Sequence, residues 1–116
     1  MLFNDYAMML VLLIGAHCFL DYAGQGDFMA KAKNRAAPIP GVPWVTVLAA
    51  HAAIHGAAVA WITGLWWFAI SEAAIHFATD DAKCRGKLTF NQDQAIHIAC
   101  KVAWVGIAVL AARGEA

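Results

Sequence analysis

Long apolar stretches separated by short polar segments dominate this sequence. Four of them cover about residues 2–24, 44–63, 65–82 and 91–112. Each approaches the ~20 residues with which a helix crosses ~30 Å of hydrocarbon. Because backbone groups in lipid have to be paired within the spanning segment, such stretches are expected to be helical. The pattern predicts an all-α fold: a four-helix transmembrane bundle forming one domain over residues 1–116.

The polar connections predict how this bundle lies in the membrane. Residues 25–43 form a long loop with a proline-rich run that stops helices, Thr63-Gly64 is a tight turn, and residues 83–90 form a second polar loop. Six of the eight basic residues lie in these two loops, which the positive-inside rule assigns to the cytoplasm. We expect an up-down-up-down, multi-pass protein of the cytoplasmic (inner) membrane, with both termini on the non-cytoplasmic side.

Composition supports lipid as the surrounding medium. Hydrophobic residues make up 62% of the chain and charged residues 14%, whereas soluble domains have about 45–50% and about 25%. The formal net charge is zero, so no basic excess indicates nucleic acid. Cys18, Cys84 and Cys100 are an odd number without CxxC spacing, and we expect small apolar side chains, with Cys84 an exposed thiol. The first apolar run has Asn4 and Asp5 near its start and lacks a basic segment, which predicts a retained span instead of a cleaved signal peptide.

Every histidine of the chain has a histidine or an aspartate four residues away, on the same face of its helix. The pairs fall one per apolar stretch: His17/Asp21, His51/His55, His76/Asp80 and Asp93/His97. A random scatter of the five histidines and six aspartates would give only about 0.7 such pairs. Because the chain has four such pairs, one on each predicted helix, we expect them to have a common function.

The depths of these residues agree across the bundle when measured at ~1.5 Å per residue from the cytoplasmic helix ends. The aspartates of the pairs fall within roughly 5 Å of that surface, four histidines at roughly 10 Å, and His55, Glu72 and Lys101 at roughly 16 Å. The histidine precedes the aspartate in the first and third helices and follows it in the fourth, as a common depth requires of antiparallel helices. Ionisable groups in a membrane face the bundle interior, so the pattern predicts a polar pocket open to the cytoplasm.

Imidazole and carboxylate ligands at one level indicate a divalent metal, zinc in the first place, with iron or manganese as alternatives. The predicted ligands are His17, Asp21, His51, His55, His76, Asp80, Asp93 and His97. This set exceeds what one tetrahedral zinc requires, so two metals are an option. Among Asp21, Asp80 and Asp93, a carboxylate that does not bind metal is the candidate catalytic base.

Simpler roles compete with these. The pairs can hold helices together by hydrogen bonds, and Asp93 falls in a first helical turn, where a negative charge suits the helix dipole. We expect Asp81 to be solvated and Lys101 to pair with Glu72. Gln25 and Asp27 follow Asp21 and are candidates for the mouth of the pocket.

The ordered motifs resemble a known family. They are the segments around Ala16-His17-Cys18-Phe19-Leu20-Asp21 and Gln25-Gly26-Asp27-Phe28-Met29-Ala30, then His51-Ala52-Ala53-Ile54-His55, Ile75-His76-Phe77-Ala78-Thr79-Asp80 and Asp93-Gln94-Ala95-Ile96-His97. Most of the chain is similar to small bacterial and phage integral membrane proteins classed as a domain of unknown function (family three-three-zero-seven). Asp80-Asp81 and a cysteine-containing loop stand where the family pattern has a lysine-bearing helix end, which leaves the acid ligand of the third helix open. The resemblance implies no activity.

Three functions follow as hypotheses. The leading one is a membrane-embedded metal-binding protein, with metal-dependent hydrolysis of a lipid or another membrane-borne ester as its activity. The first alternative is a non-catalytic phage or bacterial accessory factor whose pairs are structural, and the second is proton or divalent-cation transport. The expected partner is membrane lipid and not nucleic acid, and a homo-oligomer stays open.

Overall fold

The computed structural model describes residues 5–115, and over these residues the chain is helical, with no strand. The all-α prediction is therefore confirmed. The elements in chain order are α1 (Tyr6–Cys18), the π-helical turn η1 (Phe19–Ala23), α2 (Gly26–Ala32), α3 (Trp44–Thr63), α4 (Trp67–Cys84) and α5 (Phe90–Glu115).

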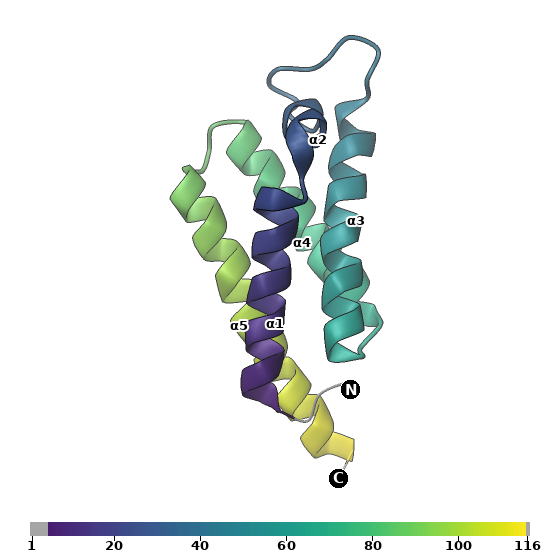
Figure 1. Cartoon of the computed structure of the whole chain (residues 1–116), viewed down its shortest axis with the longest axis vertical. Coiled ribbons are helices and arrows are strands. Elements are labelled where there is room, and N and C mark those ends of the chain that lie inside the picture. Colours follow the sequence, from purple (N-terminus) through teal and green to yellow (C-terminus); the bar gives the residue numbers. More distant parts are fainter. Residues whose placement is uncertain (1–4, 116) are drawn as a thin grey trace.

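The four long helices lie side by side in an elongated bundle of 53 × 24 × 22 Å (Figure 1). Consecutive long helices run in opposite directions along the long axis, so that the start of α1 and the end of α5 lie at the same end. We call this the terminal end. The short helix α2, the long connection to α3 and the α4–α5 connection lie at the opposite, loop end.

Within residues 5–115, three segments are long and apolar enough to cross a membrane, namely Tyr6–Ala23, Trp44–Thr63 and Phe90–Gly114. The expectation of four such segments is wrong for α4. Its mean hydropathy is lowered by acidic residues such as Glu72, Asp80 and Asp81, which the bundle buries. Residues 2–4 of the first predicted stretch lie outside the described residues.

The connection at residues 25–43 contains a helix that the sequence analysis took for loop. Gly26, with φ of 74°, begins α2, and the methionine, alanine and lysine residues that follow favour helix. The prolines end helical structure only further along, before Trp44 starts α3. The structure thus places a helical turn over the end of the bundle instead of an extended loop.

Two glycines allow α3 and α4 to pack as a close antiparallel pair. Gly64 ends α3 in the left-handed conformation, with φ of 74°, and its N–H donates to the carbonyl of Ala60 at 2.8 Å. The chain therefore turns at Thr63-Gly64, as the sequence predicted. A Cβ atom on Gly56 would lie 2.2 Å from the carbonyl oxygen of Ala69 in α4. Only glycine permits this approach, which brings the neighbouring His55 against His76 with ring centroids 3.8 Å apart.

The terminal half of the bundle has an apolar interior and an apolar exterior. The buried cluster consists of Met9, Leu13, Val59, Ile62, Phe68, Trp104 and Ala108. Large apolar side chains also cover the outside, among them Val11, Trp61, Trp66, Ile70 and Leu110. Soluble monomers rarely expose so continuous an apolar surface, so the exterior fits a lipid environment.

Candidate metal centre

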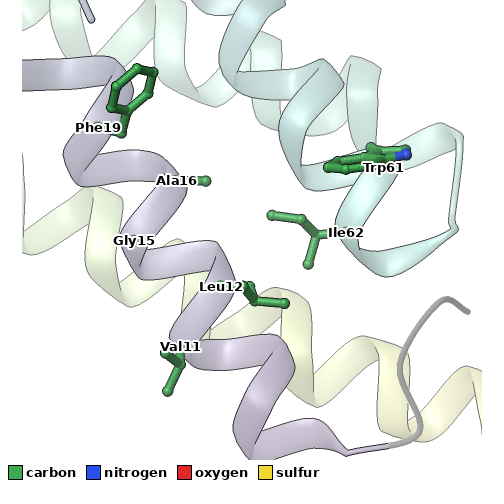
Figure 2. Close-up of a pocket in the computed structure, with 7 residues that line it drawn as sticks. All are labelled: Val11, Leu12, Gly15, Ala16, Phe19, Trp61 and Ile62. Carbon is green, nitrogen blue, oxygen red and sulfur yellow. The ribbon is translucent and has the colours of Figure 1, made fainter. Parts of the chain in front are cut away.

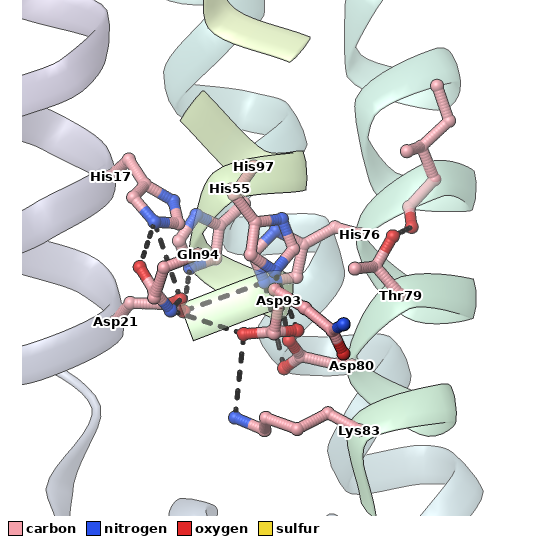
Figure 3. Close-up of polar contacts among 12 residues, drawn as sticks. His17, Asp21, His55, His76, Thr79, Asp80, Lys83, Asp93, Gln94 and His97 are labelled. Atoms are coloured by element: carbon pink, nitrogen blue, oxygen red, sulfur yellow. Dashed lines mark hydrogen bonds and ion pairs between the residues drawn. The ribbon is translucent and has the colours of Figure 1, made fainter. Parts of the chain in front are cut away.

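All five histidines converge between the four long helices, and Figure 3 shows four of them, His17, His55, His76 and His97. The five are His17 of α1, His51 and His55 of α3, His76 of α4 and His97 of α5, each at most 1% exposed. His76 lies at their centre, with its ring stacked 3.8 Å from that of His55 and 4.1 Å from that of His97. The shared depth that the sequence predicted is present, and the rings face one another.

Asp21 lies under three of these rings because a π-helical turn ends α1. Its Oδ1 lies 3.0 Å from Nε2 of His51, 3.0 Å from Nε2 of His55 and 3.6 Å from Nε2 of His76. In the widened turn the N–H of Gly24 donates to the carbonyl of Phe19 at 2.7 Å, five residues back. Such turns recur at functional sites in helices.

Asp80 faces the same space from α4. Its Oδ1 lies 3.1 Å from Nε2 of His97, and its Oδ2 lies 3.4 Å from Nε2 of His51 and 3.7 Å from Nε2 of His76. Lys33, 3% exposed at the end of α2, donates to the same Oδ2 at 2.6 Å. The short helix α2, which covers the loop end, therefore contributes the Lys33 side chain to the cluster.

Asp93 completes the acidic side of the cluster from the first turn of α5, where the helix dipole favours a negative charge. Its Oδ1 lies 3.3 Å from Nε2 of His97, and its Oδ2 lies 3.7 Å from Nζ of Lys83. Gln94 donates to Asp93 at 3.2 Å and to Asp21 at 3.0 Å, while its Oε1 lies 2.9 Å from Nε2 of His17. All eight predicted ligands thus lie in one cluster.

The donor atoms lie close enough together that small side-chain movements would bring them around one ion. Metal–ligand bonds of about 2.0–2.2 Å place neighbouring ligand atoms about 3.0–3.6 Å apart. Three overlapping sets have ligand atoms within 4.8 Å of one another: Asp21, His51, His55 and His76; His17, His76 and His97; and Asp21, His76, Asp80 and His97. Among the described residues, the buried Nε2 atoms of His55 and His76 have no hydrogen bond of normal distance and angle, although Oδ1 of Asp21 lies 3.0 Å from the first and 3.6 Å from the second. Since buried polar atoms are normally paired, these nitrogens fit a metal better than a finished hydrogen-bond network.

Of the two neighbouring acids of α4, Asp80 faces the cluster. The expectation that Asp81 is solvated is wrong. Asp81 is buried and not solvated: Arg35 donates to it from two nitrogens at 2.7 and 2.5 Å, and Nε of Arg85 lies 3.1 Å away. The hydrogen bonds that Arg35 donates to Asp81 raise the pKa of Arg35. Of these two acids only Asp80 points toward the histidines, whereas Asp81 holds the connection between α2 and α3 to α4 through its contacts with Arg35.

The sequence analysis did not predict that Lys33 and Gln94 belong to the candidate centre. Lys33 was assigned only to the basic loop, because its reach to Asp80 depends on the helix α2. Gln94 lies three residues before His97 and so on the same helix face, a spacing that would have singled it out. Gln25, expected at the mouth, donates to the backbone carbonyl of Asp21 at 2.9 Å, and Asp27 is exposed.

A second buried polar cluster lies beyond the histidines, toward the terminal end. Lys101 donates to Oε1 of Glu72 at 2.5 Å, which confirms the predicted pair, and Nε1 of Trp104 donates to Oε2 at 2.5 Å. Of the cysteines, Cys18 is exposed, whereas Cys84, expected to be exposed, is half-buried.

An apolar groove opens on the outside of the bundle between α1 and α3 (Figure 2). It has a volume of about 580 Å³ and is lined by Val11, Leu12, Gly15, Ala16, Phe19, Trp61 and Ile62. Its wall on α1 borders the candidate centre, since Ala16 precedes His17 and Phe19 lies in the turn that carries Asp21.

The comparison with known families adds one finding. A family described as "Protein of unknown function (DUF3307)" matches residues 9–113. The chain belongs to this family. The match includes α3, α4, most of α1 and α5 and every residue of the candidate centre, so the cluster lies within the family's own domain. No curated protein and no solved structure matches the chain.

Proposed function

We propose that this chain is a membrane-embedded metal-binding protein whose centre hydrolyses a lipid or another membrane-borne ester. The observation that carries the proposal is the convergence of Nε2 atoms from four helices on the carboxylates of Asp21 and Asp80. Three acids, Asp21, Asp80 and Asp93, face two cations, Lys33 and Lys83. A bound divalent cation would offset the remaining negative charge in this buried space.

In this proposal all four long helices lie in the cytoplasmic membrane, including α4. Glu72, His76 and Asp80 of α4 are buried in the bundle, while Ile70 and Ile75 on its outer face are exposed. Ionisable side chains in membranes take this inward arrangement. The basic loops give the orientation, with the loop end in the cytoplasm and both termini on the other side.

Zinc suits the histidine-rich donor set, and iron or manganese are the alternatives. A bound divalent ion supplies Lewis acidity to a water molecule and to the oxygen of an ester. Asp93 belongs to none of the three ligand sets found among the described residues, and its buried Oδ1 lacks a hydrogen-bond partner there. We assign it the base role: its carboxylate takes a proton from the attacking water and returns it to the leaving alkoxide.

The location of the centre supports a lipid as the substrate. The groove between α1 and α3 is apolar and opens toward the hydrocarbon region, so an acyl chain can lie beside the centre while its ester reaches the loop end. Transport is less well supported. The apolar cluster of the terminal half fills the bundle interior beyond Glu72 and Lys101, and an ion path needs polar groups through the whole bilayer.

Metal analysis of the detergent-purified protein tests the metal half of the proposal. Wild type should retain close to one metal ion or more per chain, and His51→Ala and His76→Ala should lose most of it. A variant with Cys18, Cys84 and Cys100 all changed to Ala should keep its metal, which excludes thiol ligation. Less than about 0.2 ion per chain in wild type, with no loss in the histidine variants, would end the proposal.

Hydrolysis is tested separately in nanodiscs of phosphatidylethanolamine and phosphatidylglycerol. Metal-loaded wild type should release fatty acid or headgroup products that mass spectrometry detects, and His76→Ala should not. A metal-loaded protein that leaves these lipids and added membrane-borne esters intact would refute the hydrolase half and leave the metal half standing.

A further inference from the structure

His76 occupies a special position because it belongs to all three candidate ligand sets. Its two ring nitrogens face different surroundings. Nε2 faces the acids of the centre, 3.6 Å from Asp21 and 3.7 Å from Asp80, whereas Nδ1 faces away from them, 3.6 Å from Oε1 of Glu72. Both nitrogens are buried, and neither has a hydrogen-bond partner among the described residues.

Glu72 is held firmly in this place. Lys101 and Trp104 donate one hydrogen bond to each of its carboxylate oxygens, and Glu72 and Lys101 are each 1% exposed. A shift of about 0.6 Å would shorten the contact with His76 to an ordinary hydrogen-bond length of about 3.0 Å. The carboxylate is thus a fixed acceptor behind the ring.

We propose that Glu72 is a positioning residue of the metal centre, which acts through His76. Its carboxylate accepts the Nδ1–H of His76, so that the proton stays on Nδ1 and the lone pair of Nε2 faces the metal. Histidine ligands usually make this contact with a carboxylate or a carbonyl on the far side of the ring. The inference rests on the proposed metal centre and adds the role of the Glu72–Lys101–Trp104 cluster.

The competing role of Glu72 and Lys101 is to fasten α4 to α5. The two roles differ in their effect on metal affinity. A buried ion pair can often be replaced by apolar side chains of similar size without loss of the fold. The double variant Glu72→Leu/Lys101→Met therefore removes both charges together, and Glu72→Gln/Lys101→Met keeps an acceptor oxygen behind His76.

Titration with Co²⁺, followed by visible absorption in detergent, gives the affinity of each variant. We expect Glu72→Leu/Lys101→Met to bind Co²⁺ about 10–100-fold more weakly than wild type, as other losses of such contacts do. Glu72→Gln/Lys101→Met should lie between the two. The control is Phe68→Leu, which weakens the α4–α5 contact with Trp104 (ring centroids 4.7 Å apart) without touching His76. It should melt earlier and bind Co²⁺ as wild type does.

The possible results separate a positioning role of Glu72 from a purely structural one. A Glu72→Leu/Lys101→Met variant that binds Co²⁺ within about twofold of wild type would overturn the inference and leave the metal centre intact. Equal weakening by Phe68→Leu would reduce Glu72 to a structural role. If the double variants do not fold, ¹⁵N NMR of histidine-labelled wild type with Zn²⁺ decides: a proton on Nδ1 of His76 supports the inference, and one on Nε2 refutes it. A wild type that binds no metal would refute the proposed function itself.

Discussion

The two halves of the bundle use the same four helices in opposite ways. In the terminal half, Leu13, Val59 and Phe68 fill the interior with apolar side chains. In the loop-end half the same helices bury histidines, aspartates and Lys33. Polar groups gain nothing from burial unless they are paired, and within the part of the chain that the structure describes several buried histidine nitrogens make no hydrogen bond of normal geometry. The terminal half thus has the character of a packed scaffold, and the loop-end half that of a site which needs an additional partner.

This difference predicts that changes in the loop-end half alter metal binding and changes in the terminal half alter stability. The largest effect is expected for Asp21→Asn, since Oδ1 of Asp21 lies close to three histidine nitrogens. Metal affinity should fall by more than about 100-fold, beyond the usual loss for contacts outside the ligand shell, and hydrolysis should disappear. Equilibrium dialysis against Zn²⁺ measures it. The matched control is Asp27→Asn, in the same segment but exposed; equal losses in both would contradict a specific role for Asp21.

The next effect separates catalysis from binding within the loop-end half. Asp93→Asn should lower the rate of lipid hydrolysis by about 10²–10⁴-fold, the usual contribution of a general base, while the metal content stays at the wild-type level. Rates in nanodiscs and metal analysis on the same preparation test this. If the metal is lost together with the activity, Asp93 is a ligand and the base has to be sought elsewhere.

A smaller effect is expected where the two halves meet. Gly56→Ala places a Cβ against the backbone of Ala69, so α3 and α4 have to separate at a cost of about 1–3 kcal/mol. Unfolding in sodium dodecyl sulfate measures this loss, and Co²⁺ affinity should also fall because His55 and His76 move apart. Gly106→Ala is the control, since nothing lies within 4 Å of a Cβ there. Equal stability of the two variants would refute the close contact.

The smallest effect tests the scaffold half alone. Leu13→Ala should reduce stability by about 1–2 kcal/mol, less than in a water-soluble core, because lipid removes the transfer contribution and leaves only packing. Zn²⁺ affinity should stay unchanged. Leu110→Ala, on the exposed face of α5, should change neither quantity. A Leu13→Ala variant that loses metal would break the division into two halves.

The sequence predicted which polar side chains gather in the bundle better than it predicted the helices and loops around them. Four-residue spacing and antiparallel order were enough to bring the five histidines and Asp21, Asp80 and Asp93 to one level, because helix geometry fixes both. What escaped prediction depends on tertiary structure. Lys33 enters the centre only because α2 folds over the loop end, and Asp81 is buried because Arg35 reaches it from that same connection.

Helix α4 shows the limit of hydropathy as a guide. Averaged along the helix, Glu72, Asp80 and Asp81 make it too polar to count as a span, although the fold buries all three side chains. A site that gathers its acids on one helix lowers the apolar average of that helix. Likewise, the turn that carries Asp21 is π-helical, which residue spacing alone does not reveal.

The central claim is that histidine nitrogens from several helices bind one metal centre. X-ray absorption at the zinc edge on Zn²⁺-loaded protein tests it most directly. The account predicts a shell of nitrogen and oxygen atoms at about 2.0–2.2 Å with the outer scattering of several imidazole rings. A shell of sulfur at about 2.3 Å, or a protein that retains no zinc after loading, would contradict it.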